Sequence, residues 1–149
     1  MILGHPTPYG RRQPDGAGAG HFGAPRGHRK HRGVDFASCV AMAVFAPCSG
    51  IISRIGWCYA DDPQYRLIEI RAERCVVSVF YVEPDVVVGD SVKFGDVIGL
   101  AQNISARYAG MNMTNHVHME MYLADDQALI GRLGTDPTDR VYVNPELFF

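Results

Sequence analysis

Residues 114–122 read Thr-Asn-His-Val-His-Met-Glu-Met-Tyr, and the rest of the chain is organised around this stretch. In a β-strand, alternation places His116, His118 and Glu120 on one face. The other face carries apolar side chains and is predicted to pack on a core; these are Val117, Met119 and Met121. Two imidazoles side by side on a rigid strand suit a metal site or a proton transfer. The alternative is a surface strand with two histidines and no site.

The composition is that of one folded domain. The chain has 149 residues, of which 47% are hydrophobic and 20% are charged, so it can bury a substantial core. A net charge of −2 gives no general signal for binding a polyanion. No stretch approaches the roughly 18 apolar residues of a membrane span.

The N-terminus, Met-Ile-Leu-Gly-His-Pro, lacks a basic segment followed by an apolar one, so no secretory signal is predicted. We therefore expect the protein to be made in the cytoplasm and to leave it only by other means. The four cysteines form no Cys-x-x-Cys pair and are expected to be reduced, mostly buried thiols. A disulfide between Cys39 and Cys48 stays open at this stage.

The first part of the chain is irregular, because glycines, prolines and charges are mixed in it without any period. We divide the chain into an arm, residues 1–20, and a single domain, residues 21–149. Such arms act as tethers or as walls of a site. The basic run at residues 26–32 is typical of a solvated loop and less often of a phosphate-binding patch. A nucleic-acid-binding protein is disfavoured, because the run lacks interleaved aromatic residues.

From residue 34 onward, short β-forming segments alternate with turns. Residues 40–46 and 51–57 are predicted to form a hairpin around Pro47-Cys48-Ser49-Gly50. Further strands are expected at 66–71 and 75–82, and two short ones within 86–99. Only residues 101–109 and 127–133 are compatible with short helices. This pattern predicts an all-β fold, mainly antiparallel, of the sandwich or open-barrel type.

Partners for the histidine strand lie at His31 and Asp35. Whether this segment is helical or a turn that leads into a strand, the two side chains can converge on one point. Zinc accepts imidazole nitrogen and carboxylate oxygen, and a catalytic site uses three protein ligands with one open position. His31, Asp35 and either His116 or His118 would complete such a set, and the remaining histidine would be free to act as a base.

Four segments together resemble the lysostaphin/LytM-like zinc endopeptidases. Gly23-Ala-Pro-Arg26 followed by His31-Arg-Gly-Val-Asp35 is similar to the first signature of this family. Val44-Phe-Ala-Pro-Cys-Ser-Gly50 resembles its next block. The Gly-Asp-x-Val pattern within residues 86–99 resembles its hairpin, and His116-Val-His118-x-Glu120 resembles its second signature. The resemblance spans residues 20–122 in the order of the family.

This resemblance implies a groove over one zinc ion per chain and hydrolysis of peptide bonds in bacterial peptidoglycan. Position by position, it assigns His31, Asp35 and His118 as zinc ligands and His116 as the catalytic histidine. Glu120 shares the face of the ligands and is a candidate to hold a histidine tautomer, or else an exposed carboxylate. In some relatives, an arm supplies a fourth zinc ligand and keeps the enzyme inactive. Residues 1–20 could cover the groove in the same way.

One position departs from the family, which carries a further histidine in a Tyr-x-His segment. Here the segment reads Val79-Phe-Tyr-Val-Glu-Pro84. If Tyr81 matches the tyrosine of the family, Glu83 takes the place of the histidine and is a candidate catalytic carboxylate. If the register is one residue earlier, Val82 fills the position and the second catalytic group is lost.

The interpretation is a zinc metalloendopeptidase that hydrolyses peptidoglycan. The alternative is a zinc-holding wall-binding or assembly protein with little or no activity. Compact size, together with the absence of a signal and of a wall-binding repeat, favours a phage-type lytic enzyme that acts on the wall after release or on a particle.

Overall fold

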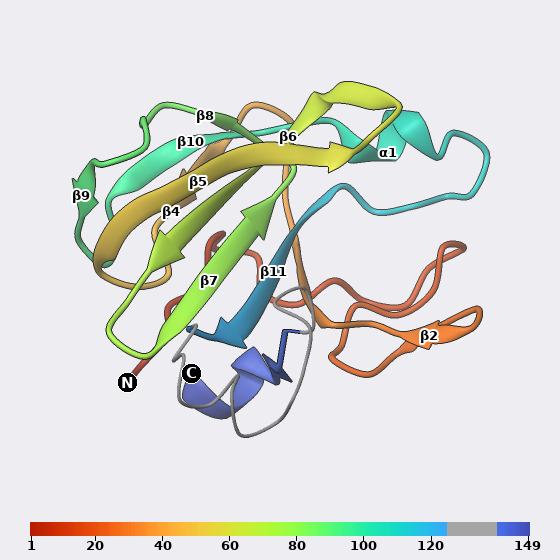
Figure 1. Ribbon diagram of the computed structural model, residues 1–149. Helices are drawn as coiled ribbons and strands as arrows, with labels where there is room; N and C mark the ends of the chain where they lie inside the picture. Colours follow the sequence, from red (N-terminus) through yellow and green to blue (C-terminus); the bar gives the residue numbers. More distant parts are fainter. Residues whose placement is uncertain (125–139) are drawn as a thin grey trace.

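The computed structural model describes residues 1–124 and 140–149, and their regular secondary structure is almost entirely antiparallel β-sheet (Figure 1). The largest sheet has seven strands and curls into a half-barrel. Its order is β12-β11-β7-β6-β5-β9, and β3 pairs with β11 on the same edge as β12. The strands are β3 (Gly33–Ala37), β5 (Gly50–Tyr59), β6 (Asp62–Arg71), β7 (Cys75–Phe80), β9 (Ser91–Val92), β11 (His116–Leu123) and β12 (Tyr142–Val143).

Smaller elements complete the fold. A three-stranded sheet has the order β4-β10-β8, from β4 (Ala43–Phe45), β8 (Val82–Pro84) and β10 (Val97–Ala101). A short hairpin joins β1 (Pro25–Arg26) to β2 (Arg29–Lys30). Helix is confined to α1 (Ile104–Arg107) and a 3₁₀ turn (Pro145–Phe148) within the described ranges. The helix predicted within 101–109 is confirmed as one turn, and the one predicted at 127–133 lies outside the described residues.

The central strands are buried because both of their faces are covered. All residues of β7 from Cys75 to Val79 are buried, as expected for a hydrophobic strand between two neighbours. In β11 the predicted alternation is confirmed. Its apolar side chains lie in the core that fills the space between the two larger sheets, with Val117 and Met119 fully buried. The predicted all-β antiparallel fold is therefore confirmed.

The hairpin predicted for residues 40–46 and 51–57 is wrong. Strand β4 pairs with β10, whereas β5 pairs with β6 and β9, so the two segments belong to different sheets. The backbone hydrogen bonds of the intervening turn are made with other parts of the chain: Ala46 N–H donates to the carbonyl of Asp96, and the Pro47 carbonyl accepts from Gly4 N–H. The turn therefore carries the chain from one sheet to the other, and local β-propensity could not distinguish this from a hairpin.

Residues 1–20 are irregular, as predicted, but they pack closely on the domain. Leu3 is buried in the core, and its N–H donates to the carbonyl of Phe148, so the two termini lie side by side (Figure 1). Further along, Asp35 N–H donates to Gly20. All four cysteines are free thiols, so Cys39 and Cys48 are not paired. No helix in the described ranges has the length and apolar character needed to cross a membrane.

Candidate metal centre and active site

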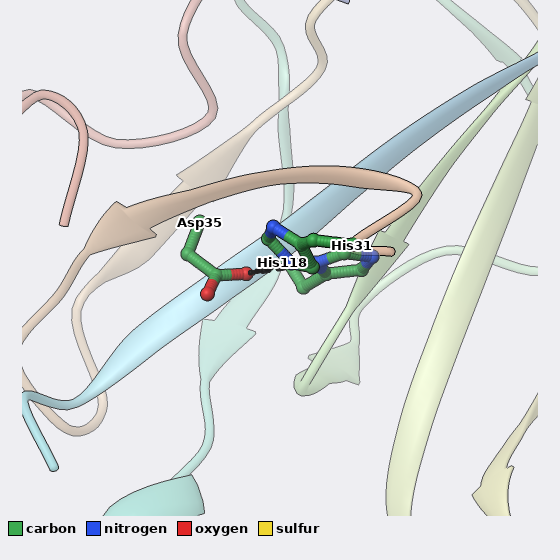
Figure 2. Close-up of side chains that lie close together, drawn as sticks. All are labelled: His31, Asp35 and His118. Atoms are coloured by element: carbon green, nitrogen blue, oxygen red, sulfur yellow. Dashed lines mark hydrogen bonds and ion pairs between the residues drawn. The ribbon is translucent and has the colours of Figure 1, made fainter. Parts of the chain in front are cut away.

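Three side chains predicted as metal ligands converge (Figure 2). His31 lies in the link between β2 and β3, Asp35 lies in β3, and His118 lies in β11 directly across from Asp35. The His118 Nδ1 atom is 2.8 Å from Asp35 Oδ1 and 3.0 Å from His31 Nε2. His31 Nε2 is 3.1 Å from the same Oδ1. The three atoms thus form a small triangle among buried groups.

The donor set fits zinc. A tetrahedral zinc ion with bonds of about 2.0–2.1 Å separates its ligand atoms by roughly 3.3 Å, close to the edges of this triangle. Each histidine also binds a partner through its other nitrogen. His31 Nδ1 lies 2.8 Å from the carbonyl oxygen of His21, and His118 Nε2 lies 3.0 Å from Glu120 Oε1. Such partners orient metal-binding imidazoles, and the position of Glu120 agrees with the supporting role predicted for it.

The second oxygen of Asp35 faces two arginines. Asp35 Oδ2 is 3.2 Å from Arg12 and 3.6 Å from Arg26. Arg12 comes from the N-terminal arm, is 2% exposed, and also pairs with Asp15 at 2.9 Å. Burial opposes ionisation of Asp35, but hydrogen bonds with His118 and His31 outweigh it and hold its pKa well below the usual value. The arm thus supplies a cation, not a metal ligand, to the site.

His116 lies beside this group and is held in one orientation. Its Nδ1 is 2.8 Å from the carbonyl oxygen of Thr114, so Nδ1–H donates there and Nε2 carries the free lone pair. The Nε2 atom is 3.7 Å from Asp35 Oδ2. Burial lowers the pKa of His116, with Asp35 opposing the shift. A neutral imidazole next to a metal site is suited to accept a proton.

The neighbouring His118 shows the opposite shift. Burial alone would lower its pKa, but hydrogen bonds to Asp35 and Glu120 raise the pKa to about 9. Both histidines face Asp35, but only His118 is hydrogen-bonded to carboxylates, so the pKa values of these two residues of β11 shift in opposite directions. His118 must therefore lose a proton before it can bind a metal ion, whereas a neutral His116 is free to accept one.

These residues lie in an open cleft of about 430 Å³. One side is formed by hydroxyl-bearing rings, which we call the tyrosine wall: Tyr59, Tyr81 and Tyr108. The lining also includes exposed cations from the β1–β2 hairpin and the link after it, which we call the basic rim: Arg29, Lys30 and Arg32. Asp35, His116 and His118 also line the cleft, and we call these buried residues the cleft floor.

The sequence profile of Peptidase family M23 matches residues 29–134 of this chain. This range contains both predicted ligand segments and more than two thirds of the protein. The chain belongs to peptidase family M23. It is thus a member of a family of zinc metallopeptidases that cleave peptidoglycan, and its His31-Asp35-His118 group is consistent with the zinc site of this family.

Several solved structures share this fold. The crystal structure of cbpa from L. salivarius REN is 22% identical, with a TM-score of 0.64, and the match covers 99% of this chain and 94% of that one. The catalytic domain of the prophage-encoded M23 protein EnpA from Enterococcus faecalis is 17% identical, with a TM-score of 0.65 and coverage of 97% and 95%. The catalytic domain of lysostaphin from Staphylococcus simulans is 23% identical, with a TM-score of 0.55 and coverage of 79% and 91%.

Glu83, a candidate catalytic carboxylate from the sequence, does not lie in the cleft of this M23 protein. Glu83 is exposed in β8, and its carboxylate faces Gln102, with 3.4 Å between Oε2 and the amide nitrogen. The alternative residue, Val82, is fully buried in the core. Tyr81 instead lines the cleft, with its ring 5.6 Å from the ring of His116. Burial raises the pKa of Tyr81 well above its usual value, so its hydroxyl keeps its proton.

Two residues of the site were not predicted from the sequence. Arg12 was hidden because its partner Asp35 is far away in the chain, and an arginine in a Gly-rich arm has the local pattern of a solvated residue. In the sequence, Tyr81 serves only to align residues 79–84 with the Tyr-x-His segment of the family. Its backbone has a φ of +68°, which its sequence context does not indicate and which turns the ring into the cleft.

Proposed function

We propose that this protein is a zinc-dependent endopeptidase that hydrolyses peptide bonds in bacterial peptidoglycan. The observation that carries the proposal is the triangle of His31 Nε2, Asp35 Oδ1 and His118 Nδ1, with edges of 2.8–3.1 Å, beside the free Nε2 of His116. Membership of family M23 and the shared fold with lysostaphin support the substrate class.

Each residue of the cleft floor has a distinct task in this reaction. Zinc held by His31, Asp35 and His118 would polarise the scissile carbonyl and make water more acidic. His116 accepts a proton from the attacking water through Nε2 and returns it to the leaving amine. Its Nδ1–H bond to Thr114 keeps Nε2 unprotonated and aimed at the floor. Arg12 and Glu120 hold the ligands in place.

A metal analysis and a wall-degradation assay on the same preparations test this. We expect about one zinc per wild-type chain and release of soluble fragments from isolated peptidoglycan. His118→Ala should lose both the metal and the activity. His116→Ala should keep the metal and lose about 10²–10⁴-fold in rate. His28→Ala, an exposed histidine on the hairpin, is the matched control and should behave as wild type.

The second candidate is a zinc-holding protein that binds the wall but cleaves little. The placement of Glu83 outside the cleft favours it, because the predicted carboxylate is then not available for catalysis. The same assay separates the candidates. Zinc in the wild type without release of fragments from any wall type would support this reading, and a chain without zinc would overturn both.

The biological setting that we propose is a phage-type lytic enzyme that reaches the wall after release or on a particle. Support comes from the fold shared with the prophage-encoded EnpA over 97% of this chain. Such a protein should lyse susceptible cells when added from outside and leave cells intact when it is produced in their cytoplasm alone. Lysis by cytoplasmic production without a release factor would contradict this setting.

A further inference from the structure

Two consecutive aromatic residues contact the two histidines of β11. Phe80, the last residue of β7, lies edge-on to His118 at 5.0 Å between ring centroids. Tyr81 lies edge-on to His116 at 5.6 Å. Neighbours in a strand point to opposite faces, so a regular strand could not place both rings here. The left-handed φ of Tyr81 ends β7 and turns its ring to the same side.

This backbone is costly for a residue with a side chain, and the surroundings hold it in place. Tyr81 N–H donates to the carbonyl of Arg66 at 2.8 Å, and the Tyr81 carbonyl accepts from Gln102 N–H at 2.9 Å. Glycine adopts this conformation without strain. An aromatic side chain at a strained position in a cleft therefore indicates that the side chain itself is needed there.

The hydroxyl of Tyr81 belongs to a chain of hydroxyls along the tyrosine wall. It lies 3.3 Å from the hydroxyl of Tyr59, which lies 2.8 Å from that of Tyr108. The guanidinium of Arg107 lies over the ring of Tyr59, 3.7 Å from its centroid. The ring of Tyr81 is thus fixed between His116 and Tyr59. The long 3.3 Å contact leaves its hydroxyl able to turn and donate to a stronger acceptor.

We propose that Tyr81 is a catalytic residue whose hydroxyl donates a hydrogen bond to the carbonyl oxygen of the scissile peptide bond as that oxygen gains negative charge. The proposal rests on the proposed peptidase function. In the reaction, water oxygen bonds to the carbonyl carbon, the C–N bond breaks, and the proton from water ends on the amine. Tyr81 keeps its own proton throughout. A fixed donor of this kind stabilises the transition state more than the substrate.

The test compares Tyr81→Phe with Tyr65→Phe, each of which removes one hydroxyl and keeps the ring. Tyr65 is buried beside Tyr81, and its hydroxyl donates to the carbonyl of Asn103, away from the cleft floor. We expect Tyr81→Phe to lower kcat by about 10²–10³-fold with KM within about twofold of wild type. Affinity for a phosphinate peptide, which mimics the tetrahedral state, should fall in parallel. Tyr65→Phe should keep kcat and phosphinate affinity near wild type.

A second variant, Tyr81→His, restores a ring donor and should recover at least tenfold of the kcat lost in Tyr81→Phe. An active wild type with an equally active Tyr81→Phe would overturn the inference and leave the peptidase function standing. Loss of zinc from Tyr81→Phe would show a structural role and also overturn it. An inactive wild type would overturn the proposed function and this inference together.

Discussion

The cleft floor and the basic rim carry charge in opposite ways. On the floor every charged group is buried and paired, as Asp35 is with His118, His31 and Arg12. On the rim, Arg29, Lys30 and Arg32 are exposed and form no ion pair with another described residue. A paired buried charge fixes geometry, whereas an unpaired exposed charge stays available to a ligand. The floor therefore has the fixed geometry that catalysis needs, whereas the rim has charge that a ligand can reach.

The largest difference should appear when one arginine is removed from each region. Arg12→Met leaves the carboxylates of Asp15 and Asp35 without their buried partner, which should cost about 3–5 kcal/mol in free energy of unfolding. Because Arg12 positions a metal ligand, zinc affinity should also fall by roughly 10–100-fold in a chelator competition. Arg29→Met on the rim should change the unfolding free energy by less than about 0.5 kcal/mol. If denaturant titrations gave the same loss of unfolding free energy for Arg12→Met and Arg29→Met, the floor and the rim would not differ in how their charges contribute to stability.

A pair of glycines offers a second contrast. Gly33 faces β11 so closely that an added Cβ would lie 2.8 Å from Cε1 of His118 and in collision with the Met119 carbonyl. Gly33→Ala should therefore force β3 from β11 and cost about 3 kcal/mol, or roughly 6–12 °C in Tm. Gly27, in the hairpin, has open space around it and a φ of +59°. Gly27→Ala should cost only about 1–2 kcal/mol, from its backbone conformation. A larger decrease in Tm for Gly27→Ala than for Gly33→Ala would contradict this prediction.

The protonation of the floor makes zinc binding dependent on pH. The pKa of His118 is raised to about 9 in the metal-free fold, so zinc must displace a proton at neutral pH. Apparent zinc affinity should rise about tenfold per pH unit from 7 to 9 and then level off. In the metal-free protein, the stability that charged His118 contributes is fully present below about pH 6.5 and is lost as the pH rises through about 9.

Glu120→Gln sharpens this experiment. The carboxylate of Glu120 is one of the causes that raise the pKa of His118. With a neutral amide in its place, the pKa falls, and the affinity plateau should begin at a lower pH than in wild type. Competition with a chelator of known affinity at several pH values measures both curves. An unchanged plateau would mean that the proton displaced by zinc is not on His118.

The contrast also explains what the sequence could predict. The proximity of His31 and Asp35 follows from their spacing within one short segment, and the two faces of β11 follow from strict alternation. Both are local patterns, whereas the choice of His118 over His116 as the third ligand came only from the family resemblance. Arg12 contacts Asp35 only after the arm has folded onto β3, and the separate sheets of β4 and β5 depend on pairing with distant strands. The turned backbone of Tyr81 is likewise fixed by partners at Arg66 and Gln102, which lie far away in the sequence.

The basic rim should give the smallest effect and the most selective one. A free carboxylate on a substrate peptide carries a negative charge that the corresponding amide lacks. If the rim recognises carboxylates, Arg29→Glu with Lys30→Glu should raise KM for an acidic peptide by about 5–10-fold at low salt, since each exposed charge contributes only about 0–1 kcal/mol. The effect should shrink at high salt, and kcat should not change, because the floor is untouched.

An amidated peptide of the same sequence separates charge recognition from damage to the cleft. Its KM should be the same in the rim variant and in wild type, because it offers no negative charge to lose. Arg71→Glu with Arg74→Glu, two exposed arginines near the β6–β7 turn that are not among the cleft residues, makes the same change in net charge and should leave both KM values unaltered. If the rim variant raised KM equally for both peptides, the hairpin would act through its shape and not through its charge. The proposed difference between the floor and the rim would then be wrong.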